Sequence, residues 1–557
     1  GLPRPDVAEA EGPGRKPKVR SQASQALKAL KALNGRPASS EGSPSYGIVV
    51  LKMLAELGVT ACLKKAFSEE IIGQIQATVA FLCASARTSF EGLSYFVQDH
   101  KCFGVDPQFD HRRAGELLVR LSLAQRDAFY EAWIRQMLRQ ESEDRIFYDF
   151  YEVTSYSACA ENLRQAAYGY THDHDDLRQI NHGLYCSRKT GIQLYMNSYH
   201  GSLNDKSNFN ETLRRADALG LHLKTDRIVI ITDIITDIIT KTITDAGLCG
   251  HNFSWTHFLN CKLLAGVPVH QLKDVRQAYL EWSRQLSPAD ESKAFFHQGN
   301  AYLSSHMPFT MAGVTGTLLM FKNLTKARAE ADECLRERQK LSDELDAATT
   351  WEGASFEVWS RPYQHYFRLT AHGKTGFTYE PREEALREEL ELCGAFTFFT
   401  TLDLKICSPL SLLKMYRTKE DVEDSFDTTK KALCDERFYV RGDRQVEGKL
   451  FLLFLSSILY RGMQLRLKQW LLDTNSSMHG AMELLQRTKH IRLSDGTWVL
   501  EDTLTQEQRA LIDALKLDLN ALPEEPATKP ESSSTMPRRQ REPRRPRRGT
   551  QGSRSDN

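Results

Sequence analysis

Acidic side chains in an apolar, strand-like run are the first residues of this sequence that could carry out chemistry. Residues 146–151 read Ile-Phe-Tyr-Asp-Phe-Tyr, with Asp149 inside the run and Glu152 directly after it. A carboxylate in such a run is costly unless it is paired, reaches solvent or binds a metal ion. Asp149 is therefore the preferred candidate for a metal ligand. A solvent-facing position on an edge strand is the alternative for Asp149, and Glu152 is the competing acid.

A second set of carboxylates stands in an Ile-Thr-Asp repeat. A four-residue unit recurs within residues 230–247, and the last aspartate is followed by Ala-Gly. Asp233, Asp237 and Asp245 have the same parity, so in one extended strand they would face the same side. The stretch is longer than an ordinary strand, which suggests a slipped duplication. We favour Asp245, because a small-residue turn follows it, and Asp233 stays open as the alternative.

A stripe of polar residues on one helix face is the third candidate. Tyr416, Lys419, Glu423 and Lys430 are spaced by three, four and seven residues. At 3.6 residues per turn they lie on one narrow face, where an ordinary helix carries apolar core residues. The alternatives are a solvated face, or a second helix start at Thr418 that interrupts the stripe.

Other motifs carry weaker signals. Residues 172–176 read His-Asp-His-Asp-Asp, which suits a metal but is more simply an exposed loop. The sequence has neither a G-x-x-x-x-G-K-[ST] loop nor a G-x-G-x-x-G turn. Chemistry driven by a nucleotide cofactor is therefore not expected.

Composition excludes several classes of protein. The chain has 557 residues, of which 41% are hydrophobic and 26% charged, and this is ordinary globular usage. Its 73 Lys and Arg balance 72 Asp and Glu, so no global positive charge draws it to nucleic acid or membrane. The eleven cysteines contain no C-x-x-C pair, which suits a reducing cytoplasm. The apolar residues 450–460 are too few to span a bilayer and predict a core helix.

Hydrophobic spacing predicts a mixed α/β protein. Three strand-like runs, near residues 146–153, 179–185 and 192–199, should form a meander, and residues 227–231 add a buried strand. Residues 395–401 form a further strand, followed by helices to about residue 472, which completes the same sheet. Between them, a charged helix is expected within residues 321–348, and residues 356–379 contain strand-like runs with a turn at His372-Gly373-Lys374.

Five parts of the chain follow from these patterns. Pro-, Gly- and Arg-rich composition marks both ends as segments without a core of their own. The expected parts are a flexible arm at 1–45, a helical domain at 46–144, a mixed α/β domain at 145–261 and 395–500, an insertion at 262–394, and a basic disordered tail at 523–557.

Together these residues resemble an insertion-sequence transposase of the DDE class, from about residue 145 to residue 472. The stripe matches the Y-x2-R-x3-E-x6-K helix of one large branch of that family. The other matching segments are Tyr148-Asp149 with Ser155-Tyr156-Ser157, the hairpin from Gly169-Tyr170 to Gly183-Leu184, the turn Gly201-Ser202-Leu203-Asn204-Asp205, and Glu447-Gly448-Lys449-Leu450-Phe451.

The resemblance implies a ribonuclease H-like catalytic domain at 145–261 and 395–500, which cleaves DNA and transfers strands with metal ions. It also implies that the helical domain at 46–144 binds DNA or mediates dimerisation. Asp149, Asp245 and Glu423 would be the catalytic residues and would ligate two Mg²⁺ or Mn²⁺ ions. Tyr416, Lys419 and Lys430 would contact DNA. The expected partners are the double-stranded DNA of the transposon ends and the target, and a second copy of the chain assembled on DNA. No membrane partner is expected, and the location would be the prokaryotic cytoplasm, at the nucleoid.

The sequence departs from the family pattern in three places. Lys419 stands where the family has Arg, which loses the bidentate fork to phosphate. The Ile-Thr-Asp repeat precedes Asp245, where the family has a single strand. Glu152 and Val153 replace small hydroxyl residues. A rival interpretation is therefore a transposase-derived DNA-binding protein whose catalytic site has decayed. A helical scaffold built on residues 321–348 has too few heptads to be favoured.

Overall fold

The structure is a computed structural model, and its described residues lie in one of two compact units of the chain. The units are residues 1–522 and 523–557. The described residues are 42–85, 89–140, 147–158, 163–168, 178–187, 189–202, 211–212, 214–221, 228–232, 262–311, 314–348, 350, 355–417, 433, 437–440, 442–492 and 498–519. The predictions for the arm at 1–45, apart from residues 42–45, and for the tail at 523–557 fall outside these residues.

A mixed sheet of ten strands runs through the described part of the chain. One of the ten strands, β13 (Arg437–Phe438), lies outside the linear order of the sheet and pairs in parallel with the end of β2 (Phe147–Ala158). Along the sheet the order is β4 (Gln193–His200), β3 (Arg178–Ser187), β2 (Phe147–Ala158), β5 (Ile228–Thr232), β6 (Lys262–Val267), β12 (Ala395–Thr400), β9 (Val314–Asn323), β8 (Asn300–Met311) and β7 (Phe295–His297).

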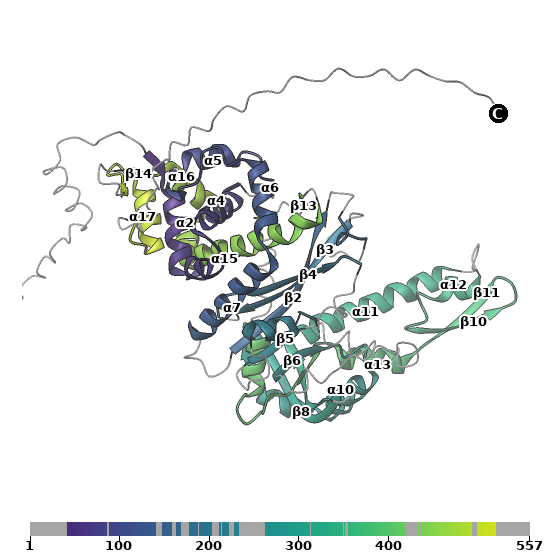
Figure 1. Cartoon of the computed structure of the whole chain (residues 1–557). Coiled ribbons are helices and arrows are strands. Elements are labelled where there is room, and N and C mark those ends of the chain that lie inside the picture. The colour runs from purple at the N-terminus through teal and green to yellow at the C-terminus, as the bar shows by residue number, and fades with distance from the viewer. Residues whose placement is uncertain are drawn as a thin grey trace, which may run out of the picture. The chain divides into compact units, whose positions relative to one another are not determined.

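Strand direction changes within the sheet. β2 pairs antiparallel with β3, and β3 with β4, so the meander predicted from residues 146–199 is confirmed. On its other side β2 pairs in parallel with β5, and β5 in parallel with β6. The chain therefore builds the sheet first to one side of β2 and then to the other. Neighbouring β2, β3 and β4 are visible in Figure 1.

Strands from the second half of the chain extend this sheet. β12 pairs antiparallel with β6 on one side and with β9 on the other. β6 and the strands β7 to β9 come from residues that the sequence assigned to the insertion. They join the same sheet because β6 is apolar on both faces, with Leu263, Leu264 and Ala265 all buried.

Helices dominate the first hundred described residues and the last seventy-five. The first group comprises α2 (Ser45–Glu56), α3 (Val59–Ala66), α4 (Glu69–Ser85), α5 (Leu93–Asp99), η1 (Lys101–Phe103), α6 (His111–Arg120) and α7 (Leu123–Gln140). The second comprises α15 (Asp443–Thr474), α16 (Met478–Arg487) and α17 (Gln506–Leu515), beside a small sheet of β1 (Gly42–Pro44), β14 (Lys489–Arg492) and β15 (Trp498–Leu500).

α15 is the central helix of this region. It packs against α4, α6 and α17, and Figure 1 shows it beside α4. Gly448 allows its close approach to α6, because a Cβ there would lie 2.2 Å from the Leu118 carbonyl oxygen. Residues 450–460 are buried within it, so the predicted core helix is confirmed.

By length and composition α15 could also cross a membrane, as could the bent pair α2 and α3 taken together. Within α15, however, 78% of the most apolar stretch is buried inside the fold. Burial of this kind is typical of a core helix whose apolar surface is already covered by neighbouring helices.

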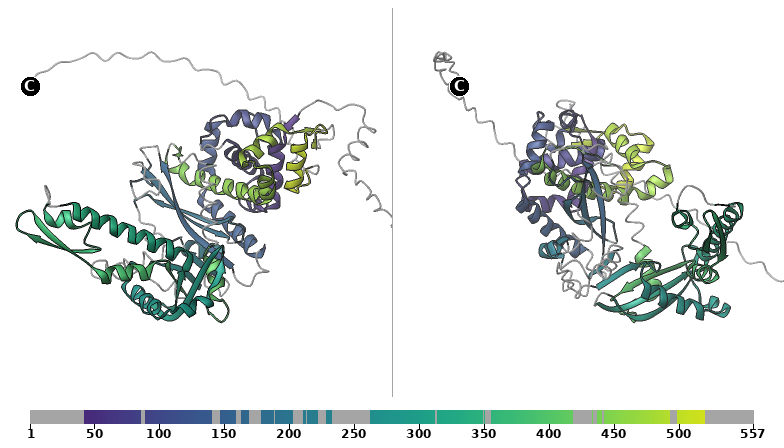
Figure 2. Two further views of the ribbon diagram at one scale, coloured as in Figure 1. Left: turned by 180° about the vertical axis from the view of Figure 1, so that it is seen from behind. Right: turned by 90° about the vertical axis from the view of Figure 1, so that its right-hand side faces the viewer.

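The part of the chain between β9 and β12 forms a small hydrophobic core of its own. Its elements are α11 (Leu324–Ala347), α12 (Phe356–Ser360), β10 (Phe367–His372), β11 (Gly376–Pro381) and α13 (Glu383–Leu392), preceded in sequence by α10 (Lys273–Gln285) and η4 (Pro288–Lys293). Cys334, Tyr366 and Phe367 are buried in it. Figure 2 shows α11 beside the β10–β11 hairpin, and the Ser342 and Tyr379 hydroxyls lie 3.3 Å apart there. The predicted turn at Gly373 is confirmed, but residues 356–360 are helical rather than extended.

The main sheet has a different core on each face. The first core contains residues of α7, α10 and α15 with Tyr185, Leu263 and Ala265. The second core contains Leu184 and Leu264, with the helical residues 409–417 packed on it through Leu412, Leu413 and Met415. Successive residues of β6 alternate between the two cores, as the period of a strand requires.

Candidate functional site

Of the six site residues that the sequence favours, the structure describes Asp149 and Tyr416, and it also describes the competing acid Glu152. Asp149 lies in β2, opposite Ser187 of β3 and Ile230 of β5. Tyr416 is half-buried near the end of the helical residues 409–417. Asp245, Lys419, Glu423 and Lys430 lie outside the described residues, as does the alternative acid Asp233. Among the described side chains, no group of three His, Cys, Asp or Glu is placed to hold a metal ion.

The two parallel strands β2 and β5 meet where the chain order of the sheet reverses. Such a switch point is where open α/β sheets bind ligands, beyond the carboxyl ends of the strands. β5 ends at Thr232, so Asp233 is the next residue of the chain. The pairing of β2 with β5 ends with Asp149 opposite Ile230 and Phe150 opposite Ile231.

Strand register assigns the acid positions of β2 to different faces of the sheet. Glu152 is directly opposite Leu184, which is buried in the second core. Tyr151 is directly opposite Tyr185, which belongs to the first core. Directly opposite residues share a face and successive residues alternate. Position 152 therefore belongs to the second-core face, and position 149 to the first-core face.

The same reasoning places the end of β5. Ile230 is opposite Leu263 of the first core, and Ile231 is opposite Leu264 of the second core. The face that position 152 shares with Ile231 is thus the one covered by the helical residues 409–417. Sequence periodicity could not find this, because the choice of face depends on partner strands more than thirty residues away.

Tyr416 packs on this face. Its ring lies 4.2 Å from that of Phe398 in β12, measured between centroids, with 30° between the ring planes. The guanidinium carbon of Arg417 lies 5.6 Å from the centroid of Phe396. These contacts fix the end of residues 409–417, from which the chain continues toward Lys419 and Glu423.

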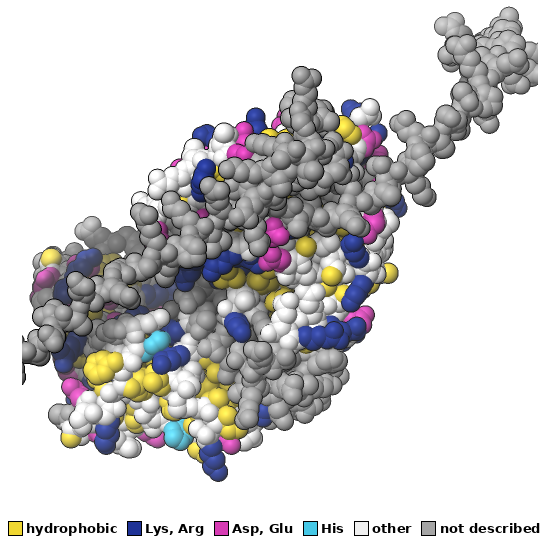
Figure 3. All heavy atoms as spheres, turned by 90° about the vertical axis from the view of Figure 1, so that its left-hand side faces the viewer, with side chains coloured by type: hydrophobic (Ala, Val, Ile, Leu, Met, Phe, Trp, Pro, Cys, Tyr) yellow, Lys and Arg dark blue, Asp and Glu magenta, His cyan; other side chains and the backbone are white. Residues whose placement is uncertain are grey.

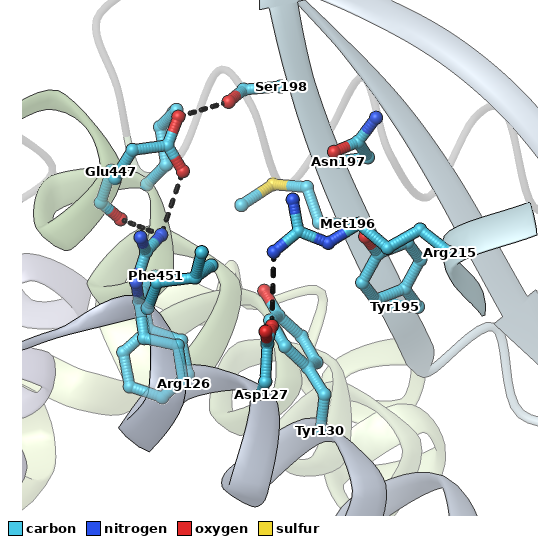
Figure 4. Close-up of a pocket in the computed structure, with 12 residues that line it drawn as sticks. Arg126, Asp127, Tyr130, Tyr195, Met196, Asn197, Ser198, Arg215, Glu447 and Phe451 are labelled. Atoms are coloured by element: carbon cyan, nitrogen blue, oxygen red, sulfur yellow. Dashed lines mark hydrogen bonds and ion pairs between the residues drawn. The ribbon is translucent and has the colours of Figure 1, made fainter. Parts of the chain in front are cut away.

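A polar pocket is lined by residues of β4, α7 and α15 (Figure 4). Glu447 is its centre. One carboxylate oxygen of Glu447 accepts a hydrogen bond from Arg126 Nη1 at 2.7 Å, and the other accepts from the Ser198 hydroxyl and from Gln165 Nε2. Burial by itself raises the pKa of the Glu447 carboxyl, but the bonds from Ser198 and Arg126 outweigh burial and hold the pKa below its ordinary value.

A second ion pair completes the pocket. Arg215 Nη2 donates to Asp127 Oδ1 at 3.1 Å, beside the buried rings of Tyr130 and Tyr195. Burial raises the pKa of the Tyr195 hydroxyl above its ordinary value. Each cation of this pocket faces its own carboxylate, so the pocket joins α7, α15 and β4 rather than presenting a free charge. Glu447 of the Glu-Gly-Lys-Leu-Phe segment therefore has a structural role in this pocket. Its hydrogen-bond partners are distant in sequence, so no local pattern could identify them.

Replacing Glu447 by Gln should lower the free energy of unfolding by about 2–3 kcal/mol, because Arg126 loses its carboxylate partner in a partly desolvated place. The Arg126 side chain is 12% exposed. Glu131→Gln is the matched control on α7: its partner Arg135 is 55% exposed, and an exposed pair contributes under about 1 kcal/mol. Urea unfolding of both variants measures the difference, and equal losses would contradict this role of Glu447.

Charge on the surface is mixed. Figure 3 shows Lys and Arg side chains interspersed with hydrophobic and acidic ones over the described part of one face. This agrees with the balanced composition of the chain. Attraction to DNA would therefore depend on the local placement of cations.

Comparison with known proteins gives a remote structural likeness. No family model matches the chain, and no curated protein matches it. Among solved structures, the chain is similar to a piggyBac transposase in a synaptic complex with hairpin DNA, at 11% sequence identity and a TM-score of 0.33. The match covers 88% of this chain and 85% of the other. Values this low establish neither a shared fold nor a shared activity.

Proposed function

We propose that this protein is a DDE-class DNA transposase with a ribonuclease H-like catalytic domain, which cleaves and joins DNA strands at insertion-sequence ends. One observation carries the proposal. The acid-bearing residues 149–152, in the first half of β2, lie beside the end of β5, where the Ile-Thr-Asp repeat begins, at the switch point between these two parallel strands.

Within this site we assign Glu152 and Asp233 as the first two acids, in place of Asp149 and Asp245. The register of β2 with β5 ends at Phe150 and Ile231, and β5 ends at Thr232. Position 152 and Ile231 belong to the second-core face, and Asp233 is the first residue after β5 in the sequence. Asp149 belongs to the other face, and Asp245 follows β5 by thirteen residues.

The third acid is Glu423. The helical residues 409–417 lie on the second-core face, and Glu423 follows them by six residues. In this assignment Glu423 completes a set of three carboxylates with Glu152 and Asp233. Lys419 and Lys430 follow on the same predicted stripe and would contact the phosphate backbone of the transposon end.

The donor set suits Mg²⁺ or Mn²⁺, since three carboxylates offer hard oxygen ligands. Glu152, Asp233 and Glu423 would hold two such ions. When bound, the ions supply the charge that activates the attacking oxygen and stabilises the leaving oxygen. The protein residues orient the scissile phosphate and exclude other geometries. Two copies would assemble on DNA, in the prokaryotic cytoplasm at the nucleoid.

Nicking of a transposon-end duplex tests the proposal. Wild-type protein should cut the duplex with Mg²⁺ and stop when the metal is removed with a chelator. Glu423→Gln should abolish cleavage while DNA binding persists, because the variant keeps its shape but loses a ligand charge. Lys430→Ala is the comparison: it should weaken binding and reduce its salt dependence, because one phosphate contact is lost. Undiminished cleavage by Glu423→Gln would refute the assigned role.

A transposase-derived DNA-binding protein is the second candidate. The Ile-Thr-Asp repeat favours it, because the repeat starts within β5 and continues in the sequence past the proposed second acid, where the family has a single strand. Salt-sensitive binding of transposon ends by wild-type protein, without cleavage under any divalent metal, would support this candidate over the first.

A further inference from the structure

The ten-stranded sheet ends in a long strand edge on β8. β9 pairs with β8 from Tyr302 to Met311, whereas β7 pairs on the other side with residues 300–302 alone. Among the described strands, none pairs with residues 303–311 on that other side. Four side chains of this stretch are exposed, those of His306, Met307, Pro308 and Thr310. The edge therefore offers backbone hydrogen-bonding groups to a strand from another molecule.

Strand register determines which residues of β8 direct their backbone groups to this open edge. His297 and Asn300 are paired across a two-residue turn, in which Gln298 and Gly299 have φ values of 46° and 75°. A turn of this kind joins a pair that exchanges both backbone hydrogen bonds. Every second residue of β8, counted from Asn300, therefore turns its N–H and C=O groups toward β7. Beyond β7 the same row continues along the open edge at positions 304, 306, 308 and 310.

Two observations agree with this alternation. The N–H of Ala301 is directed to the opposite side, where it donates to the hydroxyl of Thr325, just after β9, at 3.2 Å. Pro308, which has no N–H, stands at a position whose backbone groups are not needed for pairing with β9. The proline therefore lies inside a twelve-residue strand without interrupting its register.

The edge lacks the charged side chains that usually protect an exposed strand. β7 and β8 contain no Lys, Arg, Asp or Glu, and the register of β8 with β9 runs without a bulge from Tyr302 to Met311. Large apolar side chains are exposed along the edge, with Phe296 at 74% and Met307 at 37%. Charges, bulges and proline are devices that block edge-to-edge association. Of these three, the described residues of β7 and β8 contain a proline.

We propose that Pro308 prevents the open edge of β8 from pairing with β8 of a second copy of the chain. Two copies related by a two-fold axis would bring the same strand together antiparallel. In that pairing the N–H of residue 308 would donate to a carbonyl of the facing strand, and symmetry makes each loss count twice. Pro308 removes both donors and leaves two carbonyls without a hydrogen bond. The chain thereby keeps an uncharged, partly apolar edge without self-association through it.

Pro308→Thr tests this role, because threonine restores the N–H and favours strands. Self-association should tighten about ten- to a hundredfold, as measured by sedimentation velocity over a range of protein concentrations without DNA. The matched control moves the proline by one strand period along the same edge. The double variant His306→Pro with Pro308→Thr should sediment like wild type. Pro308→Ala restores the same N–H with a smaller side chain, and it serves if Pro308→Thr does not fold.

Amide hydrogen exchange locates the contact. As the concentration of Pro308→Thr rises, the amides of residues 304, 306 and 310 should exchange about tenfold more slowly or less, while those of 303, 305, 307 and 309, which face β9, stay unchanged. Association that leaves the first set unprotected would overturn the role of Pro308. So would a Pro308→Thr protein that sediments like wild type, a double variant that associates as strongly as Pro308→Thr, or a wild-type protein already protected at these amides.

Discussion

Asp233→Asn is expected to lower Mg²⁺-dependent cleavage of a transposon-end duplex by more than about a hundredfold, since loss of even an outer partner of a metal ligand costs about ten- to a hundredfold. Asp245→Asn should leave cleavage within about twofold of wild type. The two substitutions are chemically identical and both fall in the Ile-Thr-Asp repeat. Their different outcomes would follow from position alone, because Asp233 directly follows β5 and Asp245 does not.

The measurement is nicking of a labelled duplex at saturating protein, with DNA affinity titrated in parallel. Affinity should persist in both variants, because loss of one negative charge reduces repulsion of the phosphates. If cleavage disappears in Asp245→Asn and survives in Asp233→Asn, the second acid is Asp245 and not Asp233. Asp237→Asn, one repeat unit on from Asp233, is a further control and should cleave normally.

The second large effect is expected at the first acid. Glu152→Gln should lower cleavage by more than about a hundredfold, by the same loss of a ligand charge. Asp149→Asn should retain cleavage, because position 149 belongs to the first-core face, away from the helical residues 409–417. The matched pair removes one charge from each of two positions in a single strand, β2.

The same nicking assay is combined with thermal unfolding, so that loss of activity is separated from loss of fold. Both variants should melt as a single transition near the wild-type temperature. Inactivity of Asp149→Asn with an unchanged melting temperature would contradict the face assignment. It would place the first acid at Asp149, as the sequence pattern alone favours.

Local patterns predicted much of the secondary structure. The change from helical to strand spacing near residue 145 corresponds to the passage from α7 to β2. Alternation and turn residues predicted the meander of β2, β3 and β4. The apolar run at residues 450–460 predicted the core of α15. These predictions succeed because they depend on neighbours within one turn of helix or one strand period.

Contacts between distant segments required the tertiary structure. Glu447 is held by Arg126, Gln165 and Ser198, which are 249 to 321 residues away in sequence. No spacing rule connects such positions. The inclusion of β6 through β9 in the main sheet is of the same kind, because hydrogen bonds between strands do not depend on their separation along the chain.

The sequence by itself determined which acidic residues are available: Asp149 or Glu152 in one strand, the aspartates of the repeat, and Glu423 on a polar stripe. Only the tertiary structure decided which face of the sheet each acid position of β2 belongs to. Side chains alternate along a strand, so two acids three residues apart fall on opposite faces. One of these faces receives the helical residues 409–417, through Phe398 and Tyr416. That choice is a property of packing between strands and helix, which local sequence does not encode.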